Sequence, residues 1–163
     1  MKTNELYLKT IFCCMACDGD IAKEEVALVN SITSEQEIFR GMDIEATINE
    51  YVVSINSTGV LFLKQYLKEL SMQELSAEEQ LNIVDFAIRT IYADNKIEYS
   101  EVKFFKKIRS RLSLTDEQIL AVNPDIEEFL FPDINVVEDP EWGNVVFSNI
   151  NFAEYDDQNN SVG

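Results

Sequence analysis

The feature that most constrains this 163-residue chain is the absence of proline before Pro124. Proline breaks an α-helix because it lacks a backbone N–H and its ring clashes with the preceding turn, so a long proline-free stretch favours helices over strands and turns. Only three glycines, Gly19, Gly41 and Gly59, interrupt the same stretch, and such glycines typically separate helices. We therefore expect residues 3 to 112 to be helical almost throughout.

Hydrophobic periodicity and capping residues divide this region into the elements of an all-α bundle of about seven helices. Apolar residues recur at the spacing of one helix face, and pairs of the form Ser/Thr-x-x-Glu/Gln predict helix starts through a capping box. Short connections between such helices are typical of a bundle. The expected elements are a helix through Leu8, Ile11, Phe12 and Met15; a helix over 22–32; a short helix capped by Ser34 with Glu37; a helix capped by Asp43 and carrying Ile44, Ile48, Tyr51 and Val52; a helix over 60–70 after Gly59; a long helix opened by Ser76 with Glu79; a helix over 99–112; and a short last helix capped by Thr115 with Gln118.

The character of the chain changes after Pro124. The β-branched and aromatic stretches INVV and NVVFSNINF flank the turn-like EDPEWG, which predicts a hairpin, and the polar YDDQNNSVG predicts a disordered end. An isolated hairpin is only marginally stable, so this region must pack on the bundle, bind another molecule or stay mobile. The expected organisation is a helical domain over residues 1–123 and an acidic C-terminal arm over residues 124–163.

The net charge of −17 is concentrated in the C-terminal third, where residues 112–163 contain 12 acidic and no basic residues. A chain this acidic is repelled by phosphate backbones and anionic membranes, so we do not expect it to bind nucleic acid. Cations and basic protein surfaces are the expected partners. No apolar run is long enough to span a bilayer and the N-terminus does not resemble a secretory signal. We expect a cytoplasmic protein.

A helix-loop-helix pattern occurs twice in the sequence. A shift of 76 residues aligns TIFCCMACDGDIAKEEVALVNSI with FAIRTIYADNKIEYSEVKFFKKI. The apolar register holds on both sides, which predicts two similar helical hairpins bridged by the helices between residues 43 and 71. The aligned apolar pairs are Tyr7 with Ile83, Phe12 with Ile88, Met15 with Ile91, Val29 with Phe105 and Ile32 with Ile108.

The loop of the first copy, DGDIAKEE, fits the second half of an EF-hand calcium loop. The first half does not fit, because its first and third ligand positions would be Cys14 and Ala16 in one copy and Thr90 and Tyr92 in the other. A calcium loop needs oxygen ligands at those positions. The sequence therefore excludes an ordinary EF-hand.

The stretches ACDGDIAKEE and YADNKIEYSE resemble instead the TerB-like family, the small helical domain of the tellurite-resistance protein TerB, also found in a DnaJ-like co-chaperone. The resemblance covers roughly residues 4–122. It implies a helical bundle without catalytic activity, a role in stress or metal-anion resistance, and acidic clusters that hold divalent cations such as calcium or magnesium. The acids that fall on the motif are Asp18, Asp20, Glu24 and Glu25 in the first copy and Asp94, Glu98 and Glu101 in the second.

Helix capping is the alternative role for these acids. If Ala22 and Glu98 are the N-caps, Glu25 and Glu101 occupy the third helical position, where a carboxylate bonds a free backbone N–H and meets the positive end of the helix dipole. No metal is required for that. Two hypotheses therefore remain open: a divalent-cation module, and a co-chaperone-like adaptor that binds a protein partner and whose loop acids only cap helices.

The sequence does not predict an enzyme. Cys14 and Cys17 form a C-x-x-C pattern, but they fall inside or near the end of an expected helix, and the chain contains no histidine to complete a zinc site or act as a general base. Core packing is the expected role of the cysteines Cys13, Cys14 and Cys17.

A run of basic residues marks the helix expected over 99–112. Either this run is a solvated face, or it receives the acidic segment 133–157, in which aromatic residues alternate with acids. The basic residues are Lys103, Lys106, Lys107, Arg109 and Arg111, and the aromatic residues are Trp142, Phe147, Phe152 and Tyr155.

Overall fold

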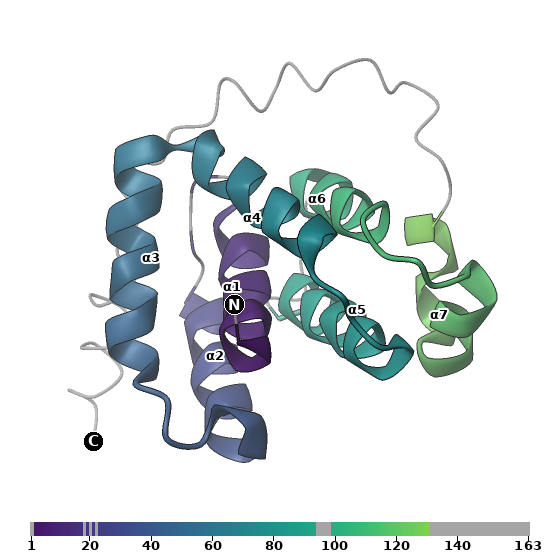
Figure 1. Ribbon diagram of the computed structural model, residues 1–163, viewed down its shortest axis with the longest axis horizontal. Coiled ribbons are helices and arrows are strands. Elements are labelled where there is room, and N and C mark those ends of the chain that lie inside the picture. The colour runs from purple at the N-terminus through teal and green to yellow at the C-terminus, as the bar shows by residue number, and fades with distance from the viewer. Residues whose placement is uncertain (1, 18, 20, 22, 94–98, 131–163) are drawn as a thin grey trace.

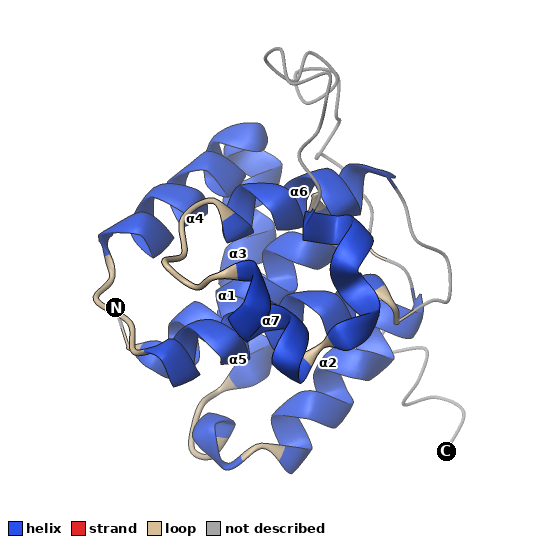
Figure 2. Cartoon of the chain, turned by 90° about the vertical axis from the view of Figure 1, so that its right-hand side faces the viewer, coloured by secondary structure: helices blue, strands red, loops and turns tan. Residues whose placement is uncertain are grey.

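The computed structural model describes residues 2–17, 19, 21, 23–93 and 99–130, and within them every regular element is a helix (Figures 1 and 2). This confirms the all-α fold class. The hairpin expected after residue 130 falls outside the described residues. The elements are α1 (Thr3–Ala16), α2 (Lys23–Glu35), the 3₁₀ helix η1 (Glu37–Phe39), α3 (Ile44–Thr58), α4 (Val60–Met72), α5 (Ala77–Ile91), α6 (Tyr99–Arg109), α7 (Asp116–Val122) and the 3₁₀ segment η2 (Pro124–Leu130).

Helix α1 is the centre of the bundle (Figure 1). From Leu6 to Ala16 every side chain is buried except that of Lys9, so this helix is apolar all round, as helices enclosed by others are. It packs most extensively on α5 and also contacts α3, α4 and α6. Lys9 is accommodated because its Nζ lies 2.8 Å from a carboxylate oxygen of Glu69 and 4.9 Å from the centre of the Phe62 ring.

Three of the predicted helix starts are confirmed. Ser76 with Glu79 opens α5 and Thr115 with Gln118 opens α7, each with both bonds of a capping box, and the Asp43 carboxylate accepts the Ala46 N–H at the start of α3. In each case a short polar side chain satisfies a backbone donor that the helix leaves unpaired.

The capping box predicted at Ser34 and Glu37 is wrong. Ser34 belongs to the last turn of α2, and its hydroxyl donates a hydrogen bond of 2.9 Å to the Ser31 carbonyl. Helix α2 runs on to Glu35, and η1 begins without a side-chain cap. A serine hydroxyl can bond within its own helix as readily as it can cap the next one, so the motif by itself did not identify a start.

Gly59 separates α3 from α4, as predicted. Its φ of 61° and ψ of −134° lie in a region that side chains with a Cβ rarely adopt. Its N–H donates to the Ile55 carbonyl, and its own carbonyl accepts the Phe62 N–H. The chain therefore ends one helix and starts the next at a single residue.

The first part of the expected acidic arm packs on the bundle. Segment η2 buries Ile126 and Phe129, and the Phe129 ring lies 5.9 Å from that of Phe105 on α6 and 6.0 Å from that of Tyr92. The packed part of the chain thus continues beyond residue 123 to Leu130. Across the part of the chain that the structure describes, no helix combines the length and apolar character needed to cross a membrane.

Candidate functional site

The two copies of the repeat occupy the core with matching faces. Both members of each of the five apolar pairs predicted from the 76-residue shift are buried, from Tyr7 with Ile83 to Ile32 with Ile108. The first helices of the two copies, α1 and α5, pack against one another, and α1 also contacts α6 of the second copy. The repeat is therefore a feature of the packing as well as of the sequence.

Two carboxylates at equivalent positions of the repeat are buried. Glu25 on α2 and Glu101 on α6 each have a relative exposure of 6%, and each is the third residue of its helix. Acidic side chains are seldom buried to this extent unless hydrogen bonds or ions stabilise the charge. Their matching burial singles them out among the acidic residues that the structure describes.

Glu25 and Glu101 both influence the pKa of the same thiol. Cys14 lies on α1 with 1% exposure. Burial is the main reason that the pKa of its thiol lies well above the ordinary value, and the neighbouring Cys13 and the carboxylates of Glu101 and Glu25 raise that pKa further. The second helix of each copy therefore contributes one carboxylate to the electrostatic environment of the same buried thiol on α1.

The other acids of the predicted site divide into two groups. Glu24, which opens α2 beside Glu25, is exposed to solvent. Asp18, Asp20, Asp94 and Glu98 lie outside the described residues. Among the residues that the structure does describe, no three acidic or cysteine side chains are close enough together to hold a metal ion, so the described geometry contributes two buried carboxylates and not a complete ligand set.

A hard divalent cation is coordinated by six or more oxygens for calcium and six for magnesium, some of them from water. Two carboxylates supply two to four of these oxygens. The loop after α1 turns at Gly19, whose φ of 90° is left-handed and whose N–H donates to the Ala16 carbonyl. The acids of this loop and its counterpart in the second copy adjoin α2 and α6 in sequence, where the two buried carboxylates lie.

The three cysteines occupy the core, as predicted. Cys13, Cys14 and Cys17 are reduced and have exposures between 0% and 2%. Burial raises the pKa of Cys13, so the neutral thiol is favoured. Reactive cysteines are exposed and have a lowered pKa, so the C-x-x-C pattern here acts as apolar packing.

A second buried polar contact lies beside Cys14. The Thr10 hydroxyl donates to the Leu6 carbonyl at 2.8 Å, and the Tyr66 hydroxyl lies 2.5 Å from the same Thr10 oxygen, so Tyr66 is the donor in that bond. Burial keeps the pKa of Tyr66 well above its ordinary value. Both hydroxyls are satisfied and neither is available to act as a base.

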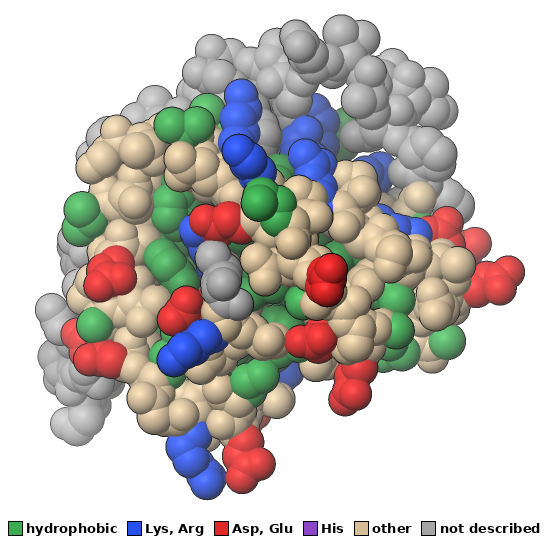
Figure 3. All heavy atoms as spheres, in the orientation of Figure 1, with side chains coloured by type: hydrophobic (Ala, Val, Ile, Leu, Met, Phe, Trp, Pro, Cys, Tyr) green, Lys and Arg blue, Asp and Glu red, His purple; other side chains and the backbone are tan. Residues whose placement is uncertain are grey.

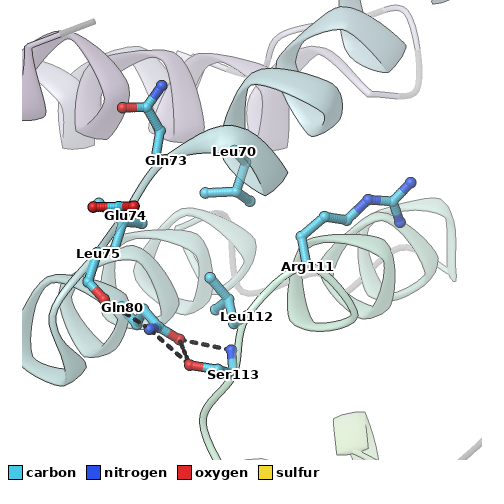
Figure 4. Close-up of a pocket in the computed structure, with 8 residues that line it drawn as sticks. All are labelled: Leu70, Gln73, Glu74, Leu75, Gln80, Arg111, Leu112 and Ser113. Atoms are coloured by element: carbon cyan, nitrogen blue, oxygen red, sulfur yellow. Dashed lines mark hydrogen bonds between the residues drawn. The ribbon is translucent and has the colours of Figure 1, made fainter.

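An open pocket of about 450 Å³ lies where α4, α5 and the α6–α7 connection meet (Figure 4). The Gln80 amide and Ser113 face each other across this junction and are joined by several hydrogen bonds, including one of 2.8 Å from the Ser113 N–H. The Arg111 side chain points away from both. These groups satisfy one another and fasten the α6–α7 connection to α5.

Sequence reasoning gave Glu25 and Glu101 as candidate site residues but did not connect them with Cys14. The sequence contains no signal for that connection, because it depends on how the helices pack around α1. The models of known protein families, the curated proteins and the solved structures compared with this chain gave no match. The fold and the site therefore define an all-α bundle built on a duplicated helix-loop-helix unit.

Proposed function

We propose that this chain is a non-enzymatic TerB-like module of the stress or tellurite-resistance type, which binds a divalent cation such as calcium or magnesium through the carboxylates of its two repeat loops. The single observation that supports this proposal is the matching burial of Glu25 and Glu101 at equivalent positions of the repeat, where both raise the pKa of the buried Cys14 thiol. Binding of the cation would either allow the protein to sense the ion or stabilise the contact between the two copies.

Helix capping by itself does not require a carboxylate to be buried. Glu79 performs the same capping role at the third position of α5, with both capping-box bonds formed, while it remains partly open to solvent. Gln118 does so on α7 while fully exposed. A capping carboxylate gains nothing from losing its hydration, and burying a charge is costly. The burial of Glu25 and Glu101 therefore favours a role beyond capping.

Electrostatics point in the same direction. Glu25 and Glu101 are both buried and both raise the pKa of the Cys14 thiol, and like charges near one another repel. A divalent cation near both would offset the repulsion and replace the lost hydration with coordination. The acids of the adjoining loops would supply further oxygens.

The test is thermal unfolding of chelator-treated protein with and without millimolar calcium, magnesium, manganese or zinc. A ligand that binds only the folded state stabilises it by RT ln(1 + [L]/Kd), which is about 2.7 kcal/mol when the ligand is at 100 times its Kd. We expect at least one ion to raise the midpoint of the wild type. The double variant Glu25→Gln with Glu101→Gln should lose that response.

This variant separates the two hypotheses because glutamine can still complete a capping box. A matched control is Glu45→Gln with Glu50→Gln, which removes the same charge from two exposed residues of α3 and should keep the full response. If no ion shifts the midpoint of the wild type, the cation proposal fails. The loop acids would then only cap helices, and the adaptor hypothesis, with a protein partner, would replace it.

A further inference from the structure

Helices α4 and α6 carry a basic surface on a strongly acidic protein. Seven of the chain's 13 basic residues lie on these two helices or just after α6, and α4 packs against α6, with the Tyr66 and Phe104 rings 6.2 Å apart. In Figure 3, Lys and Arg side chains gather along the upper edge of the molecule, over α4 and α6. The basic surface is defined as Lys64, Lys68, Lys103, Lys106, Lys107 and Arg111.

Helices α4 and α6 carry two acidic residues, Glu69 and Glu101, against six basic ones. Glu69 on α4 is paired with Lys9 of α1, and Glu101 on α6 is buried on the opposite side of its helix. Lys106 and Lys107 stand three and four residues after Lys103, a spacing at which like charges on a helix repel. An anionic segment laid over this surface would therefore be stabilised by several cations at once.

The described chain ends beside this surface. Segment η2 contacts α6, and its Phe129 ring packs on that of Phe105. The 33 residues that follow Leu130 contain seven acidic and no basic residues. At roughly 3.3 Å per extended residue, a chain of this length reaches about 100 Å, which is ample to cover two short helices.

We propose that the acidic segment 131–163 of the same chain docks on the basic surface of α4 and α6. Asp133 comes first, and the other six acids occur in two groups, Glu138, Asp139 and Glu141, then Glu154, Asp156 and Asp157, with Trp142 and Tyr155 beside them. Tethering gives such a segment an effective concentration on the order of millimolar, so weak charge pairs suffice to hold it. The docked segment keeps the basic surface from other acidic partners until a stronger competitor or a change in salt displaces it.

The docking is tested with a nitroxide spin label on the segment of the full-length chain. The substitution Ser148→Cys provides the attachment site, because the native cysteines are at most 2% exposed and are protected from the label. Paramagnetic broadening of ¹⁵N amide signals then reports which helices the segment approaches. We expect strong broadening on α4 and α6, little on α3, and loss of the broadening in 1 M salt, where the screening length falls to about 3 Å.

Charge variants make the test specific. Lys106→Glu with Lys107→Glu should abolish the broadening of α6, while the control Lys2→Glu with Arg40→Glu makes the same change in net charge at exposed residues elsewhere and should retain it. Adding Glu138→Lys with Asp139→Lys to the first variant should restore broadening by exchanging the charges. Unchanged helical circular dichroism in each variant shows that the bundle is intact.

Three results would overturn the proposal. Broadening that is equal on α3 and α6 means that the segment has no preferred site. Broadening of α6 that survives Lys106→Glu with Lys107→Glu means that charge does not hold the segment there. Broadening that appears when a spin-labelled ¹⁴N chain is mixed with an unlabelled ¹⁵N chain means that the occupant is the segment of a second copy.

Discussion

The two copies of the repeat differ most in their first helices, although the sequence pattern is the same. Helix α1 buries ten of its 14 residues and begins without a side-chain cap. Helix α5 buries eight of its 15 residues, keeps an exposed side and opens with a complete capping box. A helix enclosed by neighbours is stabilised by apolar burial, whereas a helix at the surface depends more on side-chain hydrogen bonds that cap its ends.

The second helices of the copies share their inner face and differ on their outer face. Both bury a glutamate at the third position. The last turn of α6 carries Lys106, Lys107 and Arg109, whereas the last turn of α2 has no basic residue. The buried glutamate is therefore common to both copies, whereas the basic surface lies on α6 of the second copy and on the bridging helix α4.

The largest expected effect tests the central position of α1. Phe12→Ala removes a fully buried ring that contacts Tyr51 and Phe62, with ring centres 5.4 and 5.7 Å away, and should lower the free energy of unfolding by about 3–5 kcal/mol. The matched change Ile88→Ala on α5, at a residue that is 6% exposed, should cost less. Urea unfolding measures both, and equal losses would contradict the central role of α1.

A smaller expected effect distinguishes the two copies through the pH dependence of the free energy of unfolding. Cys13 and Cys14 have no thiol counterparts in the second copy, where Arg89 and Thr90 occupy the aligned positions. Burial is the main cause of the raised pKa of both thiols, so folding favours the protonated form. The resulting stability is fully present below the unfolded thiol pKa and is lost as pH rises above it.

The wild type should therefore lose up to about 1 kcal/mol per pH unit per thiol once the pH exceeds roughly 8.5. The variant Cys13→Ala with Cys14→Ala should show a flatter dependence between pH 8 and 9.5, measured by urea unfolding under reducing conditions. Buried tyrosines such as Tyr66 also have a raised pKa, but their ordinary pKa of about 10 places their contribution at higher pH. Identical slopes for the two proteins would show that the thiols do not carry the effect.

The smallest effect concerns the helix ends. Ser76→Ala removes the hydroxyl that accepts the Glu79 N–H at 3.1 Å, and should cost about 1 kcal/mol of stability. Lys2→Ala at the equivalent end of α1, where no side chain caps the helix, should cost nothing measurable. Thermal unfolding of both variants compares the two helix starts. A loss of stability in Lys2→Ala as large as that in Ser76→Ala would show that α1 and α5 do not differ in their dependence on capping.

The candidate site was predictable only in part. Glu25 and Glu101 stand out in the sequence because they occupy the same position in both copies, and the structure shows that both are buried. Glu24 belongs to the same motif but is exposed, since a motif of adjacent acids does not show which side of a helix faces the core. The role of the remaining motif acids in cation binding stays a prediction.

The sequence by itself determined the local features of this protein. The helices, the glycine between α3 and α4, two complete capping boxes and the register of the repeat depend on interactions a few residues apart, and all were predicted. Only the tertiary structure decided that α1 is the central helix, that Glu25 and Glu101 are buried, and that η2 packs on α6. These features depend on which helix faces fit together. The hydrophobic effect is not directional, so the arrangement is determined by close packing of all the core side chains and not by any local sequence pattern.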